Sequence, residues 1–202
     1  EQNHLPYDVV IQTLRTESLE PVISAPEPEQ MPQADAQTVP PQGNTPPAQN
    51  FRITDDLLGV GGAKAKFRAN MDAINLLKKL EFDGRQATPE EQDILSKYVG
   101  WGGLADAFDE SKDNWKDEFA ELYTMLTPEE YAAARASTLN AHYTSPTVIK
   151  AIYEAVGNMG FQTGNILEPS MGVGNFFGCL PEQMQSSKLY GVELDSITGR
   201  IA

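Results

Sequence analysis

The chain has 202 residues, a net charge of −14, one cysteine (Cys179) and two histidines (His4 and His142). A single thiol excludes an internal disulfide and a multi-thiolate metal site, and two distant histidines argue against a histidine-based one. No apolar run approaches the roughly 20 residues of a membrane span, and no signal peptide is visible. These features predict a cytoplasmic protein with no membrane partner. The acidity argues against a protein that coats nucleic acid, so any DNA contact should use a local patch.

The first fifty residues differ in composition from the rest. Residues 1–20 are too short to fold alone and are interpreted as the end of an upstream segment. Residues 21–50 hold eight of the fourteen prolines, five glutamines and three charged residues. Such a stretch cannot bury enough surface to offset its ordering entropy, which predicts a disordered linker. Residues 1–50 carry seven acids and one arginine, a charge of −6, which leaves −8 of the −14 for the globular part.

Residues 51–140 are predicted to form a mostly helical module that begins with a helix over residues 63–80. Four apolar residues fall on one face of this helix at helical spacing; they are Phe67, Met71, Ile74 and Leu77. The opposite face carries the only basic cluster of the globular part. Its members are Lys64, Lys66, Arg68, Lys78 and Lys79. The cluster is either a solvated helix face, which we favour, or a contact for the phosphate backbone of DNA.

Two further helices of the module have the same start signal. Thr88 and Thr127 each open a Thr-Pro-Glu-Glu sequence, a capping box with proline at the first helical position. The first predicts a helix over residues 89–99 and the second a helix through residue 137. A Gly-Trp-Gly-Gly segment, residues 100–103, breaks the first. Trp101 between these glycines could stack on a base, but we favour a plug of the hydrophobic core.

From residue 141 the pattern changes to alternating helices and strands. Pro146 begins a helix that Gly157 should end, with one apolar face made of Val148, Ile149, Ile152 and Val156. We then expect a strand over residues 165–167, a helix over 175–184, a strand over 188–193 and the start of a helix at 198. Two strands leave an unpaired sheet edge, so we interpret residues 141–202 as the truncated first part of an α/β domain.

The two strands and the turn between them indicate a ligand class. The first strand ends on Glu168, the turn contains Gly172 and Gly174, and the second strand ends on Glu193. This is the outline of a β-α-β unit that holds a nucleoside-containing cofactor. The glycines allow close approach of a ligand, and Glu193 can accept hydrogen bonds from two ribose hydroxyls. A carboxylate at the turn is a poor neighbour for a pyrophosphate, so Glu168 fits a zwitterionic ligand without phosphate better.

Other interpretations of the turn remain open. Gly172, Gly174 and Gly178 can be read as a relaxed dinucleotide fingerprint, which keeps a nicotinamide-dependent oxidoreductase in consideration. The acid-proline pair before the turn and the bulky Phe176 and Phe177 argue against it. A third interpretation is an ordinary strand-turn-helix without a ligand.

At these residues the chain resembles the adenine-specific DNA methyltransferases that methylate an exocyclic amino group. Residues 168–176 (Glu-Pro-Ser-Met-Gly-Val-Gly-Asn-Phe) are similar to their S-adenosylmethionine-binding motif, residues 191–195 to their second cofactor motif, and residues 143–146 to the segment before the first strand. The resemblance covers residues 141–202 and implies a Rossmann-like fold. It also implies S-adenosylmethionine as cofactor, with a site made of Tyr143, Thr144, Glu168, Pro169, Ser170, Gly172, Gly174, Phe176, Glu193 and Leu194.

The resemblance implies a role for several of these positions. Thr144 would hold the methionine carboxylate, and Glu168 with the backbone of residues 172–174 would hold the amino-acid portion. Glu193 would bind the ribose, and Leu194 and Phe176 would pack near the adenine.

Residues 88–104 resemble the lead-in of very large methylase–helicase proteins of conjugative elements and phages. The expected partners are therefore DNA and the remainder of a parent chain, including a possible helicase domain. The family's catalytic motif, an Asn or Asp followed by Pro-Pro and an aromatic residue, does not occur in these 202 residues. We therefore expect the cofactor-binding part of a methyltransferase that is inactive by itself. A non-catalytic DNA- or cofactor-binding module of a helicase-like protein is the alternative.

Overall fold

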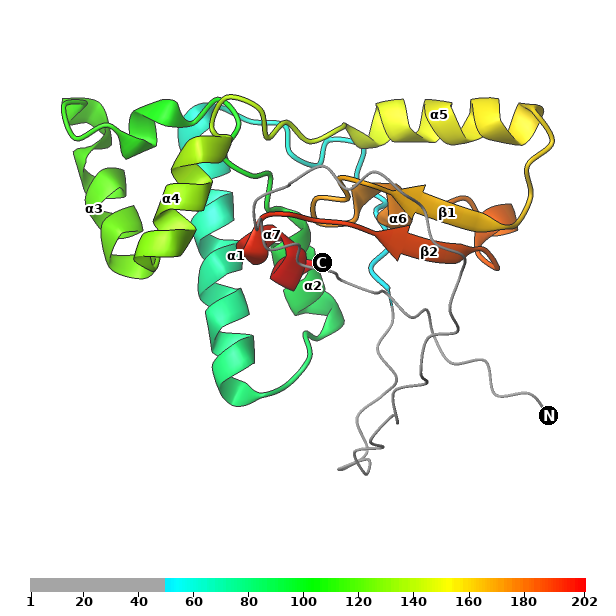
Figure 1. Cartoon of the computed structure of the whole chain (residues 1–202), viewed down its shortest axis with the longest axis horizontal. Helices are drawn as coiled ribbons and strands as arrows, with labels where there is room; N and C mark the ends of the chain where they lie inside the picture. Colours follow the sequence, from blue (N-terminus) through cyan, green and yellow to red (C-terminus); the bar gives the residue numbers. More distant parts are fainter. Residues whose placement is uncertain (1–49) are drawn as a thin grey trace, which may run out of the picture.

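The structure, a computed structural model, describes residues 50–202 and is mostly helical, with one small parallel sheet (Figure 1). The upstream segment and nearly all of the linker lie outside the described residues. Four helices, α1 to α4, lie together at one end of the view, and the two strands lie at the other under α5. None of the described helices is both long and apolar enough to cross a membrane.

Helix α1 (Ala63–Asp83) is the longest element, and its buried face is the one that the sequence predicts. Gly84 follows in a left-handed conformation, and its amide and that of Arg85 bond to the last carbonyls of the helix. A glycine in this position is the common end of an α-helix because it carries no Cβ. The helix therefore continues one turn beyond the predicted end at residue 80.

The other helices of the module are α2 (Pro89–Ser96), α3 (Lys116–Met125) and α4 (Pro128–Ser137), with short 3-10 helices at Ala105–Phe108 and Asp113–Trp115. Both predicted capping boxes are present: the side chains of Thr88 and Thr127 accept the amides of Glu91 and Glu130, whose carboxylates bond back. The prediction of α4 is confirmed in full. Helix α2 ends three residues before the predicted residue 99.

The second part of the chain contains α5 (Pro146–Asn158), β1 (Asn165–Glu168), α6 (Asn175–Gly178), a 3-10 helix (Glu182–Met184), β2 (Lys188–Gly191) and α7 (Ser196–Ile201). β1 and β2 pair in parallel, with Ile166 opposite Leu189 and Glu168 opposite Gly191. A β-α-β crossover therefore joins them. The structure therefore shows an α/β unit with two parallel strands. The expected Rossmann-like fold needs further strands, which the described residues do not contain.

Several boundaries in this part differ from prediction. Gly157 lies inside α5 and does not end it. The helix predicted over residues 175–184 stops at Gly178, because Pro181 has no amide hydrogen to donate and restricts the residue before it. β2 ends at Gly191, two residues before Glu193. Val148 and Ile152 of α5 are 50% and 43% exposed, so the predicted apolar face is only partly buried.

Two hydrophobic clusters hold these elements together. The larger surrounds Trp101, which is 1% exposed and packs edge-on against Phe67 and Phe108; the preferred interpretation of Trp101 as a core plug is confirmed. Ile197 of α7 belongs to this cluster, so the core of the helical module extends into the second part of the chain. The smaller cluster lies between α5 and the sheet and includes Ile53, whose amide bonds to the carbonyl of Gly178 at 2.9 Å.

Candidate functional site

The glycine turn lies between the carboxyl end of β1 and the start of α6. Gly172 and Gly174 both have left-handed backbones, with φ of 57° and 83°. Other residues rarely adopt these angles, which is why the turn needs glycine at both positions. The amide of Met171 bonds to the carbonyl of Val192 at 3.0 Å, and that of Val192 bonds to the carbonyl of Glu168 at 2.9 Å. The turn is therefore fastened to the chain that follows β2.

Glu193 follows β2 and reaches back to this turn. Its Oε2 accepts the Gly172 amide at 2.9 Å, and its Oε1 accepts the Asp195 amide at 2.8 Å. The side chain is half-buried. Each carboxylate oxygen can accept more than one hydrogen bond, so both retain acceptor capacity for hydroxyls of a ligand. The carboxylate thus joins the glycine turn to the start of α7.

Glu168 lies at the end of β1, beside Gly191 of β2. Its Oε1 accepts the amide of Ser170 at 3.3 Å, a long hydrogen bond that leaves most of its acceptor capacity unused. The side chain is half-buried, while Pro169 and Ser170 are exposed. The structure thus places two carboxylates, Glu168 and Glu193, at the carboxyl ends of two adjacent parallel strands, which is where ligands of open α/β sheets bind.

Three of the other predicted cofactor residues differ in their accessibility. Thr144 is exposed, and Leu194 is 76% exposed, so a ligand could reach both. Phe176 packs against Tyr153 of α5, whose hydroxyl donates to the Phe176 carbonyl at 3.0 Å. Burial, together with Cys179 and Glu168 nearby, raises the pKa of Tyr153 to about 12. Phe176 is therefore held by the smaller hydrophobic cluster.

Tyr143 is half-buried, and its ring lies against the glycine turn. Its hydroxyl is 3.5 Å from the Thr198 hydroxyl, a weak hydrogen bond. Burial is the main reason why its pKa lies well above the ordinary value of 10, so Tyr143 stays protonated at physiological pH.

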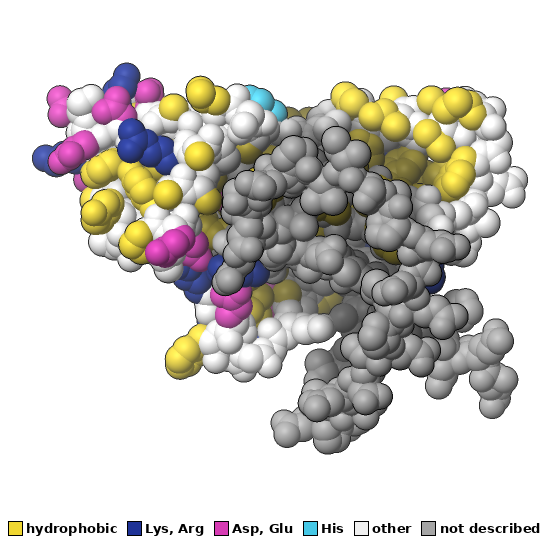
Figure 2. Space-filling model, in the orientation of Figure 1, with side chains coloured by type: hydrophobic (Ala, Val, Ile, Leu, Met, Phe, Trp, Pro, Cys, Tyr) yellow, Lys and Arg dark blue, Asp and Glu magenta, His cyan; other side chains and the backbone are white. Residues whose placement is uncertain are grey.

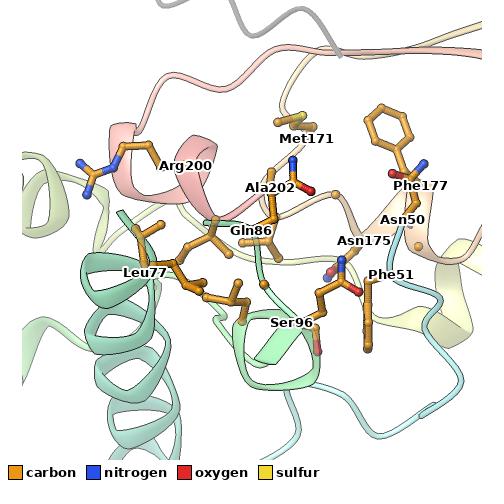
Figure 3. Close-up of a pocket in the computed structure, with 18 of the residues that line it drawn as sticks. Asn50, Phe51, Leu77, Gln86, Ser96, Met171, Asn175, Phe177, Arg200 and Ala202 are labelled. Atoms are coloured by element: carbon orange, nitrogen blue, oxygen red, sulfur yellow. The ribbon is translucent and has the colours of Figure 1, made fainter. Parts of the chain in front are cut away.

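A cavity of about 710 Å³ lies on another side of the turn (Figure 3). Apolar residues of α1, α2 and β2 line it together with Arg200 and Ala202 of the chain end. Of the predicted cofactor residues only Gly174 reaches this cavity. Its lining includes Leu77, Leu95 and Phe177, and Asn175 points into it from the start of α6. This cavity is therefore distinct from the place where the two carboxylates lie.

The basic cluster of α1 is largely engaged within the protein. Lys64 pairs with Glu118 at 2.6 Å and lies 4.0 Å from the ring centre of Trp115. Arg68 pairs with both carboxylate oxygens of Glu121 at 2.9 and 2.6 Å. On the part of the face in Figure 2 that is not grey, basic and acidic side chains accordingly lie side by side over the helical module.

Lys78 binds Glu130 at 2.9 Å and the carbonyl of Met125 at 2.6 Å. Three of the five cations therefore join α1 to α3 and α4. Lys64 and Arg68 form their ion pairs on an exposed face, with side chains 47% and 51% exposed, which agrees with the interpretation as a solvated face, whereas Lys78 is half-buried. Among the described residues, Lys66 and Lys79 form no ion pair within 4 Å. Of these two lysines, Lys79 is exposed and Lys66 is half-buried.

Sequence reasoning missed several residues around the turn. Asp195 accepts both the amide and the hydroxyl of Thr198 at 2.7 Å and so caps α7. Asn70 is fully buried in α1 and binds the Gly-Trp-Gly-Gly segment. The sequence did contain a signal for Asn70, because this polar residue lies three residues after Phe67 on a helix face that is otherwise apolar. Asp195 had a local signal as well, because an Asp three residues before the amide that it accepts is a common N-cap.

Comparison with known proteins gives one distant similarity. The chain is 28% identical over 133 residues to defense against restriction protein B of Escherichia phage P1. The match covers 66% of this chain and 4% of the phage protein. No family profile matches the chain, and no solved structure matches it. The similarity relates the chain to one segment of a very large phage protein.

Proposed function

We propose that this chain is the cofactor-binding part of an S-adenosylmethionine-dependent, adenine-specific DNA methyltransferase within a larger methylase–helicase protein. The observation that carries the proposal is the position of Glu168 and Glu193 at the carboxyl ends of two parallel strands, with a left-handed glycine turn between them. The second carboxylate suits the ribose diol and the first suits the ammonium of a zwitterionic ligand. The fold of the complete domain would be Rossmann-like.

The distant phage relative supports the biological setting of this proposal. Its name describes defence against restriction, and methylation of adenine is one chemistry that protects DNA from restriction endonucleases. We therefore propose a mobile-element protein that acts on DNA. The sulfonium sulfur is already a good leaving group, because it departs as a neutral thioether when the amine nitrogen attacks the methyl carbon, so the protein would mainly align donor and acceptor. The residues for the target base would lie in other parts of the domain.

The role of Glu193 gives the direct mutational test. Glu193→Ala should weaken S-adenosylmethionine binding by roughly 1–3 kcal/mol, because two ribose hydroxyls would lose their acceptor. Glu154→Ala, which removes an exposed carboxylate of α5, is the matched control and should leave affinity unchanged. Isothermal titration measures both, and circular dichroism checks that both fold. Equal affinity of a folded Glu193→Ala variant and the wild type would remove the ribose assignment.

A further inference from the structure

The Gly-Trp-Gly-Gly segment, residues 100–103, is held on two sides. From α1, the side-chain amide nitrogen of buried Asn70 donates to the Gly100 carbonyl at 2.6 Å, and its side-chain oxygen accepts the backbone amide of Val99 at 2.9 Å. On the other side, the amide of Gly102 donates to the Ala141 carbonyl at 3.1 Å and that of Gly103 to the Thr138 carbonyl at 2.9 Å. The segment therefore has a fixed position between α1 and the chain that leads to Tyr143.

The ring of Tyr143 lies between two glycines that are distant in the sequence. A Cβ placed on Gly100 would lie 2.6 Å from Cε2 of this ring, and a Cβ placed on Gly172 would lie 2.7 Å from Cε1. Both distances are shorter than a van der Waals contact, so one edge of the ring touches the backbone of the Gly-Trp-Gly-Gly segment and the other touches the glycine turn. Both glycines are also left-handed, with φ of 66° and 57°.

A series of bonds closes this arrangement around the turn. The Gly172 amide binds Glu193, which also binds the Asp195 amide, and Asp195 binds Thr198. The Thr198 hydroxyl in turn lies near the Tyr143 hydroxyl. Tyr98, whose ring meets Tyr143 edge-on at 6.3 Å, fills the space behind it. The position of the turn thus depends on a ring that the helical module holds.

We infer that Tyr143 is a positioning residue through which the Gly-Trp-Gly-Gly segment sets the conformation of the ligand-binding turn. In this role the segment determines the conformation of the site without contacting the ligand directly. Displacement of the ring would move Gly172 away from Glu193 and so alter the carboxylate proposed to bind the ribose. The identity of the ligand in this inference rests on the proposed function, whereas the mechanical coupling does not.

The test compares two left-handed glycines of the same segment. Gly100→Ala would force the Tyr143 ring to move, whereas Gly103→Ala places its methyl group in open space at a similar φ of 75°. Both variants carry the same kind of backbone penalty, so Gly103→Ala is the control. Tyr143→Phe keeps an aromatic ring at this position, whereas Tyr143→Leu removes the ring that contacts both glycines. All are made in the 202-residue chain.

The primary readout is amide hydrogen exchange at residues 171, 172 and 174, whose amides are bonded in the turn. Exchange should be about tenfold faster in Gly100→Ala and Tyr143→Leu, and within about twofold of wild type in Gly103→Ala and Tyr143→Phe. Unchanged exchange in both folded variants of the first pair, or an equal rise in Gly103→Ala, would overturn the inference.

Titration with S-adenosylmethionine gives the second readout and separates the inference from the proposed function. Affinity should fall about tenfold in the same two variants that exchange faster. A wild-type chain that binds no S-adenosylmethionine, yet shows the expected exchange pattern, would contradict the proposed function and support the positioning role. Binding that is equally strong in all four variants, with unchanged exchange, would support the proposed function and contradict the positioning role.

Discussion

Asn70 is an amide side chain with no exposed surface in the middle of a hydrophobic helix face. Burial of an amide is unfavourable unless its hydrogen bonds are made, and here the acceptor oxygen and a donor hydrogen are both used by one short segment. The residue therefore fixes where the chain turns after α2. An apolar residue at this position could fill the space but would leave the Gly100 carbonyl and the Val99 amide unpaired.

This predicts a large effect of a small substitution. Asn70→Ala should lower the free energy of unfolding by about 2–4 kcal/mol, because two backbone groups lose their partners inside the protein. Asn114→Ala is the control: its side chain is exposed, and the backbone carbonyl that accepts Lys64 remains. Its effect should stay within about 0.5 kcal/mol. Urea denaturation followed by fluorescence measures both, and equal stability of the two variants would contradict the role of Asn70.

Part of this candidate site could be predicted from residue types and their spacing. Glu168, Gly172, Gly174 and Glu193 could be selected because acids and glycines at strand ends have few structural uses at that spacing. The contact between Tyr143 and Gly100 could not, because it joins positions 43 residues apart through the shape of a ring. The bond from Glu193 to the Gly172 amide is likewise long-range. The sequence analysis assigned this acid to the ribose of a ligand and missed that it fastens the turn to α7.

At the scale of elements, a carboxylate holds three helices together. Glu130 of α4 binds Lys78 of α1 at 2.9 Å and Arg200 of α7 at 3.0 Å, and Arg200 also binds Glu81 of α1. Burial alone would raise the pKa of Glu130, but the Thr127 amide, Lys78 and Arg200 together hold it below its ordinary value of 4.5. The ionised form is therefore the one that the folded protein binds best.

The sign of this pKa shift predicts the response to acid. Because the folded pKa is lowered, the carboxylate stabilises the fold above pH 4.5, and this contribution is lost as pH falls through the lower folded value. Glu130→Gln should lower the free energy of unfolding at pH 7 by about 1–3 kcal/mol, a value reduced by solvent screening because both cations are partly exposed. The dependence of stability on pH below 4.5 should also become weaker in this variant. Exposed Glu129→Gln is the control. Thermal unfolding from pH 7 to pH 3 measures this, and parallel curves for the two variants would contradict it.

Start signals of helices were better predicted than their ends. The two Thr-Pro-Glu-Glu boxes are local, so their hydrogen bonds follow from four residues and the prediction of both starts is confirmed. The end of α5 depends on what Gly157 packs against, and a Cβ there would meet the methyl group of Met184 at an ordinary 3.7 Å. Pro181 did carry a local signal against a helix through residue 184, and that signal was overlooked.

At the scale of the whole molecule, the helical module and the β-α-β unit share a core. Ile197 belongs to the cluster around Trp101, and Tyr143 packs against it from the edge. The face of the sheet with Leu167 and Tyr190 is more open, at 63% and 36% exposure. Hydrophobic side chains are also visible over α5 in Figure 2. The shared core explains why a change in the helical module should reach the glycine turn.

Charge at this scale predicts how DNA contact should be tested. Reversal of Lys64 or Lys78 would place like charges beside Glu118 and Glu130, so a loss of DNA binding in such variants would not separate a lost phosphate contact from a lost ion pair. Lys66→Glu with Lys79→Glu avoids both ion pairs. If α1 contacts phosphate, the double variant should weaken DNA binding and reduce its salt dependence by up to about two charges. Unchanged affinity and salt slope in fluorescence anisotropy would exclude Lys66 and Lys79 from the DNA contact.

The measurement that tests the central claim most directly is calorimetric titration of the folded 202-residue chain with S-adenosylmethionine, alongside NADH. The position of Glu168 and Glu193 at the two strand ends predicts saturable binding of S-adenosylmethionine, no binding of NADH, and weaker binding by Glu193→Ala than by Glu154→Ala. Binding of NADH alone would replace the proposed function with a nicotinamide-dependent one. Absence of heat with both ligands, in a chain that circular dichroism shows to be folded, would contradict the claim that this turn holds the cofactor.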